Sequence, residues 1–226
     1  IDGKSYSNSY ESLDLAYRNG IRIFEVDIYT TVDGYYVLSH DALVSTMTYE
    51  QFMSKKVYGK YTPMDLSDLI DFMKSHKYAY IIPDIKQYNK GDVLLSIYQE
   101  LFNYTGGNKN VSNRIIGTFK RVDMLEYVSK YVDFDIKILY YRNTVKQEQV
   151  INTYEKFVEY CLKNDIHNVV LSTLQFSANT ANKLNNKKLN VIVYTIDNKS
   201  VFEQYIFRGA DGIMTNFLVP QKEERI

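Results

Sequence analysis

The sequence predicts an α/β fold in which a largely parallel sheet is covered by helices. Short runs of β-branched and aromatic residues alternate with longer stretches of helical periodicity along the whole chain. The strand runs are almost continuously apolar, as expected for strands buried on both faces. The length of 226 residues fits one compact unit, so we expect a single domain over residues 1–226.

The expected elements have clear boundaries along the chain. Asn19-Gly20 is a stop signal for the first helix, and Arg208-Gly209 is one for the last. The expected strands are Ile21–Ile28, Tyr78–Ile85, Arg114–Phe119, Ile136–Tyr141, Asn168–Ser172, Asn190–Ile196 and Gly212–Thr215. The expected helices are Tyr10–Arg18, Asp65–Ser75, Lys90–Tyr104, Val122–Lys130, Lys146–Lys163, Ala178–Asn185 and Ser200–Phe207.

Strands and helices of these lengths fit either a closed barrel or an open doubly wound sheet. No glycine-rich phosphate loop follows an early strand, which weakens the case for a nucleotide-binding open sheet. A TIM (β/α)8 barrel needs one strand more than the sequence offers, and we expect that strand, the first of the barrel, upstream of Ile1.

The composition limits the partners and the compartment. The 27 basic and 27 acidic residues cancel, so no global field favours nucleic acid or an anionic membrane, and phosphate must be bound by a local site. The lone Cys161 excludes an internal disulfide and a thiolate metal cluster, and it slightly favours the cytoplasm. No apolar run reaches the ~18 residues that cross a bilayer, so we expect membrane contact only through residues outside this segment.

Two carboxylates share one face near the end of the first expected strand. Glu25 and Asp27 are two positions apart, so their side chains point the same way. Carboxylates that project together repel one another unless a cation or a proton is shared, which makes this pair candidate ligands for Ca²⁺ or Mg²⁺. The alternative is one acid that faces solvent and one that pairs with Arg22 or a lysine.

A hairpin follows this strand and ends in a histidine. Asp33-Gly34 is typical of a tight turn, and Tyr35–Ser39 is expected to return as a short strand. The hairpin brings His40 back beside the carboxylates, where an imidazole can exchange protons near neutral pH. A lone histidine is more often an ordinary loop residue, and we expect His76 and His167 to be surface or helix-end histidines.

A second charged pair follows the apolar run that begins at Tyr80. Asp84 would complete a cation site with three carboxylates, while Lys86 faces the same way and would reach a phosphate oxygen. The alternative is a simple ion pair between Asp84 and Lys86. Asn8 lies on the loop before the first helix, and we expect it to cap that helix rather than to touch a substrate.

The stretch Asn8–Asp41 resembles the signature block of the glycerophosphodiester phosphodiesterase family. It contains an Asn turn, a helix, a glycine, a strand with ExD, a DG hairpin and then HD, in the order NSYESLDLAYRNGIRIFEVDIYTTVDGYYVLSHD. Tyr61–Leu66 is similar to the family's TPL-type helix entry, and PDIK at Pro83–Lys86 continues the likeness. Near the end of the chain, two segments are similar to the family's last two strands: VIVYTID and RGADGIMTN. The resemblance thus covers nearly the whole chain, and the middle third is compatible with the family without matching a motif.

The resemblance implies a TIM barrel that hydrolyses glycerophosphodiesters to an alcohol and glycerol 3-phosphate. It implies a divalent cation, Ca²⁺ or Mg²⁺, held by Glu25, Asp27 and Asp84. It also implies that His40 is one of two catalytic histidines and that Lys86 contacts the phosphate. The expected partner is a small phosphodiester such as a deacylated phospholipid, which points to lipid metabolism.

Three features depart from the family pattern. The other catalytic histidine of the family lies in an HRG- or HAGG-like motif at the end of the first strand, and we expect it upstream of Ile1; without it, hydrolysis would be severely impaired. Asp84 stands where glutamate is common, and its shorter side chain would pull the ion towards that strand or admit a water. Tyr194 replaces a common tryptophan on the seventh strand, and we expect it to stack against the substrate.

Two other functions fit these residues. Sphingomyelinase D-type phospholipases resemble this barrel and also use ExD, a hairpin histidine and a DxK strand, and the short segment between His40 and Asp84 favours them somewhat. A non-catalytic barrel that binds a phosphorylated ligand or a partner protein would not need the upstream histidine. Such a barrel would have no use for the complete set of carboxylates, histidine and lysine.

Overall fold

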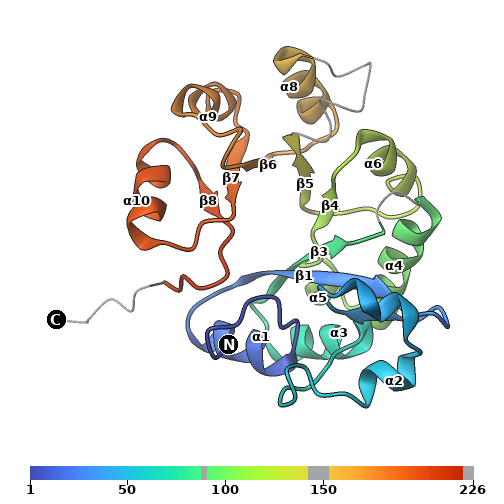
Figure 1. Ribbon diagram of the computed structural model, residues 1–226. Coiled ribbons are helices and arrows are strands. Elements are labelled where there is room, and N and C mark those ends of the chain that lie inside the picture. Colours follow the sequence, from blue (N-terminus) through green and yellow to red (C-terminus); the bar gives the residue numbers. More distant parts are fainter. Residues whose placement is uncertain (88–90, 142–152, 221–226) are drawn as a thin grey trace. The chain divides into compact units, whose positions relative to one another are not determined.

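The computed structural model describes residues 1–87, 91–141 and 153–220 of the chain (Figure 1). These residues divide into two compact units. One comprises residues 1–116 with Val219 and Pro220, and the other comprises Gly117–Leu218. Within the described residues, the helices are too short or too polar to span a bilayer.

The first unit is built on a three-stranded sheet. Its strands are β1 (Ile23–Thr30), β2 (Tyr36–Leu38) and β3 (Tyr80–Ile85), in the order β2-β1-β3. β1 pairs in parallel with β3 over residues 23–28 and antiparallel with β2 over residues 28–30. The parallel part of β1 therefore ends where the apolar run of the sequence ends, and the last two residues belong to the hairpin.

The helices of the first unit begin at polar side chains that accept main-chain hydrogen bonds. Ser9, Thr48 and Asp65 each form a capping box with the residue three positions later, an arrangement that contributes about 1 kcal/mol to a helix. The helices of this unit are α1 (Tyr10–Arg18), the 3₁₀ helix η1 (Ala42–Thr46), α2 (Tyr49–Met53), α3 (Leu66–Ser75), α4 (Gly91–Tyr104) and α5 (Lys109–Ser112).

The alternation of side chains along β1 separates a packed face from a polar face. Phe24, Val26 and Ile28 are buried, and the Phe24 ring meets the Phe72 ring of α3 edge to face, with 5.8 Å between centroids. Each buried side chain of this size contributes roughly 1.5–3 kcal/mol to stability. Because strand side chains alternate with a period of two, Glu25 and Asp27 must project from the opposite face.

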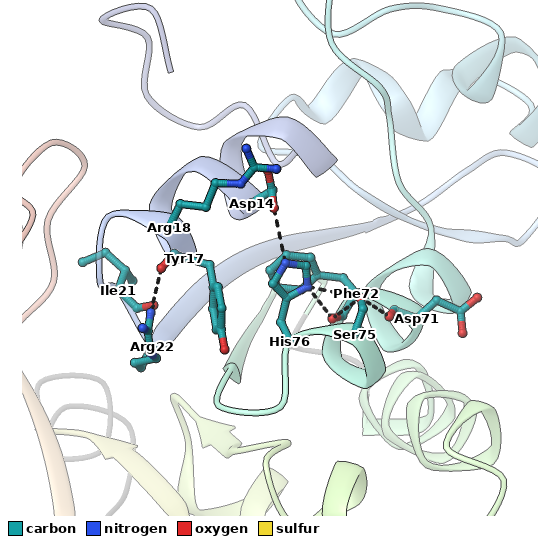
Figure 2. A network of polar contacts seen from close by, with 9 residues as sticks. All are labelled: Asp14, Tyr17, Arg18, Ile21, Arg22, Asp71, Phe72, Ser75 and His76. Carbon is teal, nitrogen blue, oxygen red and sulfur yellow. Dashed lines mark hydrogen bonds and ion pairs between the residues drawn. The ribbon is translucent and has the colours of Figure 1, made fainter.

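A polar network joins the middle of α1 to the C-terminal end of α3 (Figure 2). His76 is the C-cap residue of α3. Its Nε2 lies 3.3 Å from an Asp14 oxygen on α1, and its Nδ1 lies 2.9 Å from the Phe72 carbonyl oxygen (Figure 2). The expectation that His76 is a helix-end histidine is confirmed, although it is mostly buried; His167 is exposed and contacts Asp165.

Arg114 holds the end of α3 against the start of β3. Its guanidinium donates to the carbonyl oxygens of Met73, His76 and Ala79 at 2.6–3.0 Å, and Nε donates to that of Asn110 at 2.7 Å. Burial lowers the pKa of Arg114 from its ordinary value, but the helix-end carbonyls, which carry partial negative charge, compensate the buried cation.

The second unit holds a five-stranded sheet in which every pair is parallel. Its strands, in spatial order, are β4 (Gly117–Phe119), β5 (Lys137–Tyr140), β6 (Asn168–Ser172), β7 (Asn190–Tyr194) and β8 (Gly212–Ile213). Its helices are α6 (Val122–Val128), α8 (Tyr154–Lys163), α9 (Ala178–Asn185) and α10 (Lys199–Phe207). A Cβ atom on Gly117 would lie 2.7 Å from the Phe134 ring, so this position requires glycine.

The expected elements are present, with four kinds of difference. Several elements begin or end one or two residues from their expected limits, such as β1, expected as Ile21–Ile28, and β7, expected as Asn190–Ile196. Residues 146–152 of the expected helix Lys146–Lys163 lie outside the described residues, as does Lys90. The strand expected from Arg114 begins only at Gly117, because the main chain around Ile115 bonds to Ile81 of β3 instead. The short helices η1, α2 and α5 were not predicted, since one or two turns leave little periodicity.

Candidate active site

Three carboxylates converge on the polar face of the first unit's sheet. Asp27 and Asp84 are register partners in the parallel pair of β1 and β3, and Glu25 lies one side chain back along the same face of β1. Each of the three offers an oxygen within 4.8 Å of the other two. Asp27 and Asp84 are buried, while Glu25 is exposed. The predicted convergence of the three acids is therefore confirmed as geometry.

Lys86 lies between the two buried carboxylates. Its Nζ forms an ion pair with Asp27 Oδ1 and another with Asp84 Oδ2, the latter at 2.6 Å. Burial by itself lowers the pKa of Lys86, but attraction to Asp84 and hydrogen bonds to both acids outweigh burial, and the pKa lies above its ordinary value. The ammonium group therefore stays charged and offsets part of the negative charge.

Asn8 is hydrogen-bonded to the Asp27 carboxylate and does not cap the first helix. The helix cap is Ser9, so the expectation for Asn8 was wrong. The Asn8 amide nitrogen donates to Asp27 Oδ2 at 2.8 Å, and its amide oxygen accepts from the Asp27 main-chain N–H at 2.9 Å. Asn8 and Ser9 are both residue types that cap helices, and the local sequence does not show which of the two takes the cap.

The hairpin leads from β1 to His40 as expected. Gly34 has the positive φ, 91°, that its turn requires, and the Ser39 N–H donates to the Asp27 carbonyl oxygen at 2.9 Å. The next residue, His40, is exposed, and its ring stacks on Tyr6 with 4.2 Å between centroids and 27° between planes. Tyr6 was not predicted, because nothing in its local sequence indicates this partner.

Tyr194 lies at the end of β7 in the second unit. It is partly buried, and its ring meets Tyr140 at a centroid distance of 5.7 Å with an angle of 61°. Phe119 is buried against Phe134, and Tyr141 lies edge to face with Phe157. Phe119, Tyr140 and Tyr141 thus each pack against another aromatic ring of the same unit.

The residues of the first unit fit a hard divalent cation. Carboxylate oxygens are the ligands that Ca²⁺ and Mg²⁺ prefer, and an ion with ligands at about 2.0–2.6 Å spans roughly 4–5 Å across its coordination sphere. The 4.8 Å limit on the oxygen separations falls in that range. One oxygen of Asp27 and one of Asp84 already contact the same positive group, the ammonium group of Lys86. Both oxygens are therefore directed towards a common point.

Comparison with known proteins identifies a family to which this chain is similar. Residues 2–219 match the model of the glycerophosphoryl diester phosphodiesterase family, whereas no curated protein matches the chain.

Similar folds occur in solved structures of enzymes from several organisms. A glycerophosphodiester phosphodiesterase from Galdieria sulphuraria shares 17% identity at a TM-score of 0.75, over 95% of this chain and 89% of its own. A phosphodiesterase from Oleispira antarctica, solved with its product sn-glycerol-3-phosphate, shares 14% identity at a TM-score of 0.75 over the same fractions. The enzyme from Thermotoga maritima shares 20% identity at a TM-score of 0.63, over 92% of this chain and 88% of its own.

The predicted α/β fold class with a TIM-barrel fold is confirmed by these structural similarities. The family match extends across residues from both units. It includes the acidic strand β1, the hairpin to His40 and the strand β3 with its lysine. The chain therefore belongs to the glycerophosphoryl diester phosphodiesterase family.

Proposed function

We propose that this chain hydrolyses glycerophosphodiesters to an alcohol and glycerol 3-phosphate with the help of a divalent cation. One observation carries the proposal: the oxygens of Glu25, Asp27 and Asp84 gather within 4.8 Å of one another beside a lysine ammonium group. Family membership supports the reaction. The product bound to the enzyme from Oleispira antarctica supports the substrate class.

The three carboxylates are the proposed ligands of Ca²⁺ or Mg²⁺. A cation bound there would polarise the phosphoryl oxygens and offset the negative charge that grows on them during the reaction. Asp27 and Asp84 hold their places through the main-chain pairing of β1 and β3. Glu25 is exposed, so its side chain can adjust to the size of the ion.

Lys86 is the proposed phosphate contact. An ammonium group has three N–H donors, and two of them are directed at Asp27 and Asp84. The third would bind a non-bridging phosphate oxygen. Its raised pKa supports this role, because attraction to the two acids favours the charged form of the ammonium group.

His40 is the proposed acid–base residue within this chain. The hydrogen bond from the Ser39 N–H to the Asp27 carbonyl holds the end of the hairpin at β1, directly before His40. His40 is exposed, and the stacked Tyr6 ring supports one face of its imidazole. Such a group can exchange a proton with the attacking or the departing oxygen.

Two further assignments are proposals drawn from the resemblance. We propose that residues 1–226 form a single domain, which the family match over residues 2–219 supports. We also propose that Tyr194 contacts the substrate, because it occupies the place of the family's common tryptophan on the seventh strand.

The products of the reaction test the function. Glycerophosphocholine is incubated with the chain in Mg²⁺ or Ca²⁺ and in chelator, and phosphorus NMR identifies the phosphorylated product. Cation-dependent release of glycerol 3-phosphate is the expected result. A cyclic phosphate would instead support a sphingomyelinase D-like phospholipase. Intact substrate together with tight phosphate binding, also when the residues expected upstream of Ile1 are included, would support a non-catalytic barrel.

A further inference from the structure

The side chain of Asn8 makes two short hydrogen bonds to one residue of β1, and its amide nitrogen also lies 3.4 Å from the Tyr6 carbonyl oxygen. Its amide nitrogen donates to the Asp27 carboxylate, and its amide oxygen accepts from the Asp27 main-chain N–H, at 2.8 and 2.9 Å. Both residues are buried, with exposed fractions of 7% for Asn8 and 2% for Asp27. Hydrogen bonds away from water have fixed geometry and are costly to lose.

These bonds complete the surroundings of Asp27. Its carbonyl oxygen accepts from the Ser39 N–H, so the hairpin and the Asn8 loop use the two main-chain polar groups of Asp27. The two carboxylate oxygens also have different partners, since Oδ2 accepts a hydrogen bond from Asn8 and Oδ1 forms an ion pair with Lys86. The amide thereby fixes the rotation of the carboxylate and turns Oδ1 towards Lys86.

The loop that carries Asn8 is folded in an unfavourable backbone conformation. Tyr6 and Asn8 have φ values of 58° and 45°, in the left-handed region, where asparagine is tolerated and a bulky residue such as tyrosine is rare. The result is that the Tyr6 ring stacks on His40 while the Asn8 amide reaches Asp27. Strained backbone of this kind is typical of positions that organise a functional site.

We infer that Asn8 is a positioning residue that fixes the Asp27 carboxylate for cation binding, an inference that rests on the cation site proposed above. Asn8 itself does not ligate the cation in this inference. It restricts the carboxylate to the rotamer in which one oxygen joins the oxygens of Glu25 and Asp84. Hydrogen-bond partners of metal ligands act in this way, and their loss typically costs about 10–100-fold in metal affinity.

Calorimetric titration with Ca²⁺ alone and with Mg²⁺ alone tests the inference without reference to turnover. Asn8→Gly removes the two amide bonds to Asp27 and the longer one to the Tyr6 carbonyl oxygen, and glycine adopts the positive φ of this position without strain. We expect its cation Kd to rise by about 10–100-fold. The matched control is Ser12→Ala, which removes one half of the capping box at the same loop without touching Asp27; its Kd should be unchanged.

A second measurement uses the unsubstituted chain. The side-chain amide proton signals of Asn8 should shift when Ca²⁺ is added, because the carboxylate that they bind changes partner. Those of Asn19, the C-cap residue of α1, should not shift. This readout holds even if Asn8→Gly fails to fold.

The outcomes separate the inference from the function. Equal affinity in Asn8→Gly and the unsubstituted chain overturns the inference and leaves the proposed function standing. An equal loss of affinity in Ser12→Ala also overturns it, since loop order rather than the amide would then control binding. If the unsubstituted chain binds neither cation, the proposed cation site and the inference fail together.

Discussion

Asp27 and Asp84 are direct neighbours in the register of β1 and β3, and both pair with the ammonium group of Lys86. Register partners in a parallel pair point to the same face of the sheet. The main-chain hydrogen bonds of the two strands therefore determine the spacing of the acids, and side-chain flexibility has little influence on it.

Asp27→Asn should abolish cation binding and turnover. The amide has nearly the same shape, but it is neutral and removes one anionic ligand from the three. Calorimetry with Mg²⁺ and a glycerol 3-phosphate assay measure the two effects. Asp71→Asn, at an exposed acid paired with Lys74, is the matched control and should behave like the unsubstituted chain. Turnover by Asp27→Asn in chelator would contradict the mechanism.

Lys86→Met should destabilise the chain in chelator and make its stability depend on added cation. Without the ammonium group, Asp27 and Asp84 face each other uncompensated, which costs roughly 1–3 kcal/mol. Thermal unfolding followed by circular dichroism should show a lowered Tm that Ca²⁺ largely restores. Lys60→Met, which removes an exposed ion pair with Asp2, should have little effect in either buffer. If added Ca²⁺ leaves the Tm of Lys86→Met unchanged, this would argue against a cation site at Asp27 and Asp84.

His40→Asn should reduce kcat/KM by about 10²–10⁴-fold while cation affinity stays the same. The residue supplies proton exchange in the proposal, and it is not among the three acids that gather as ligands. Steady-state kinetics and calorimetry on the same preparation separate the two properties. His167→Asn, at an exposed histidine that contacts Asp165, serves as the comparison. Full activity of His40→Asn would remove His40 from the mechanism.

Arg114→Met should lower the free energy of unfolding by on the order of 3 kcal/mol. The substitution leaves the carbonyl oxygens at the end of α3 without their donors. Urea denaturation measures the loss. Arg18→Met breaks an ion pair between an exposed arginine and the partly buried Asp14 one helical turn away and should cost no more than about 0.5 kcal/mol. Equal midpoints for the two variants would show that Arg114 contributes little.

The thiol of Cys161 should be unreactive in the folded chain. Burial raises its pKa from 9.0 to about 12, so the nucleophilic thiolate is scarce at neutral and mildly alkaline pH. Between pH 9 and about 12, the thiol is deprotonated in the unfolded chain but not in the folded chain. The free energy of unfolding therefore falls as the pH rises through this range. A thiol reagent should label the chain in urea and not in buffer at pH 8. Rapid labelling of the folded chain would show that α8 opens.

The sequence predicts most of the fold because periodicity is a local property. The runs Asn168–Ser172 and Ala178–Asn185 have their predicted boundaries. The shared face of Glu25 and Asp27 follows from the two-residue repeat of a strand. The strand order within each sheet is not local, and the pairing of Ile115 with Ile81 shortened a strand that its composition favoured.

The sequence predicted which acids gather at the site, but it did not predict most of the side chains that bind to them. The sequence offered two interpretations of Lys86, an ion pair with Asp84 or a contact with phosphate, and the structure shows the ion pair extended to Asp27. Asp27 pairs with that lysine and not with Arg22, which donates to the carbonyl oxygens of Tyr17 and Ile21. The bond between Asn8 and Asp27 joins positions 19 residues apart, and no local pattern indicates it.

The shared register of β1 and β3 also affects how such an enzyme can diversify. Main-chain pairing, and not the connection from Asp41 to Asp65, sets the distance between the two buried acids. That connection can therefore lengthen, shorten or change its composition over evolutionary time while the two acids keep their spacing.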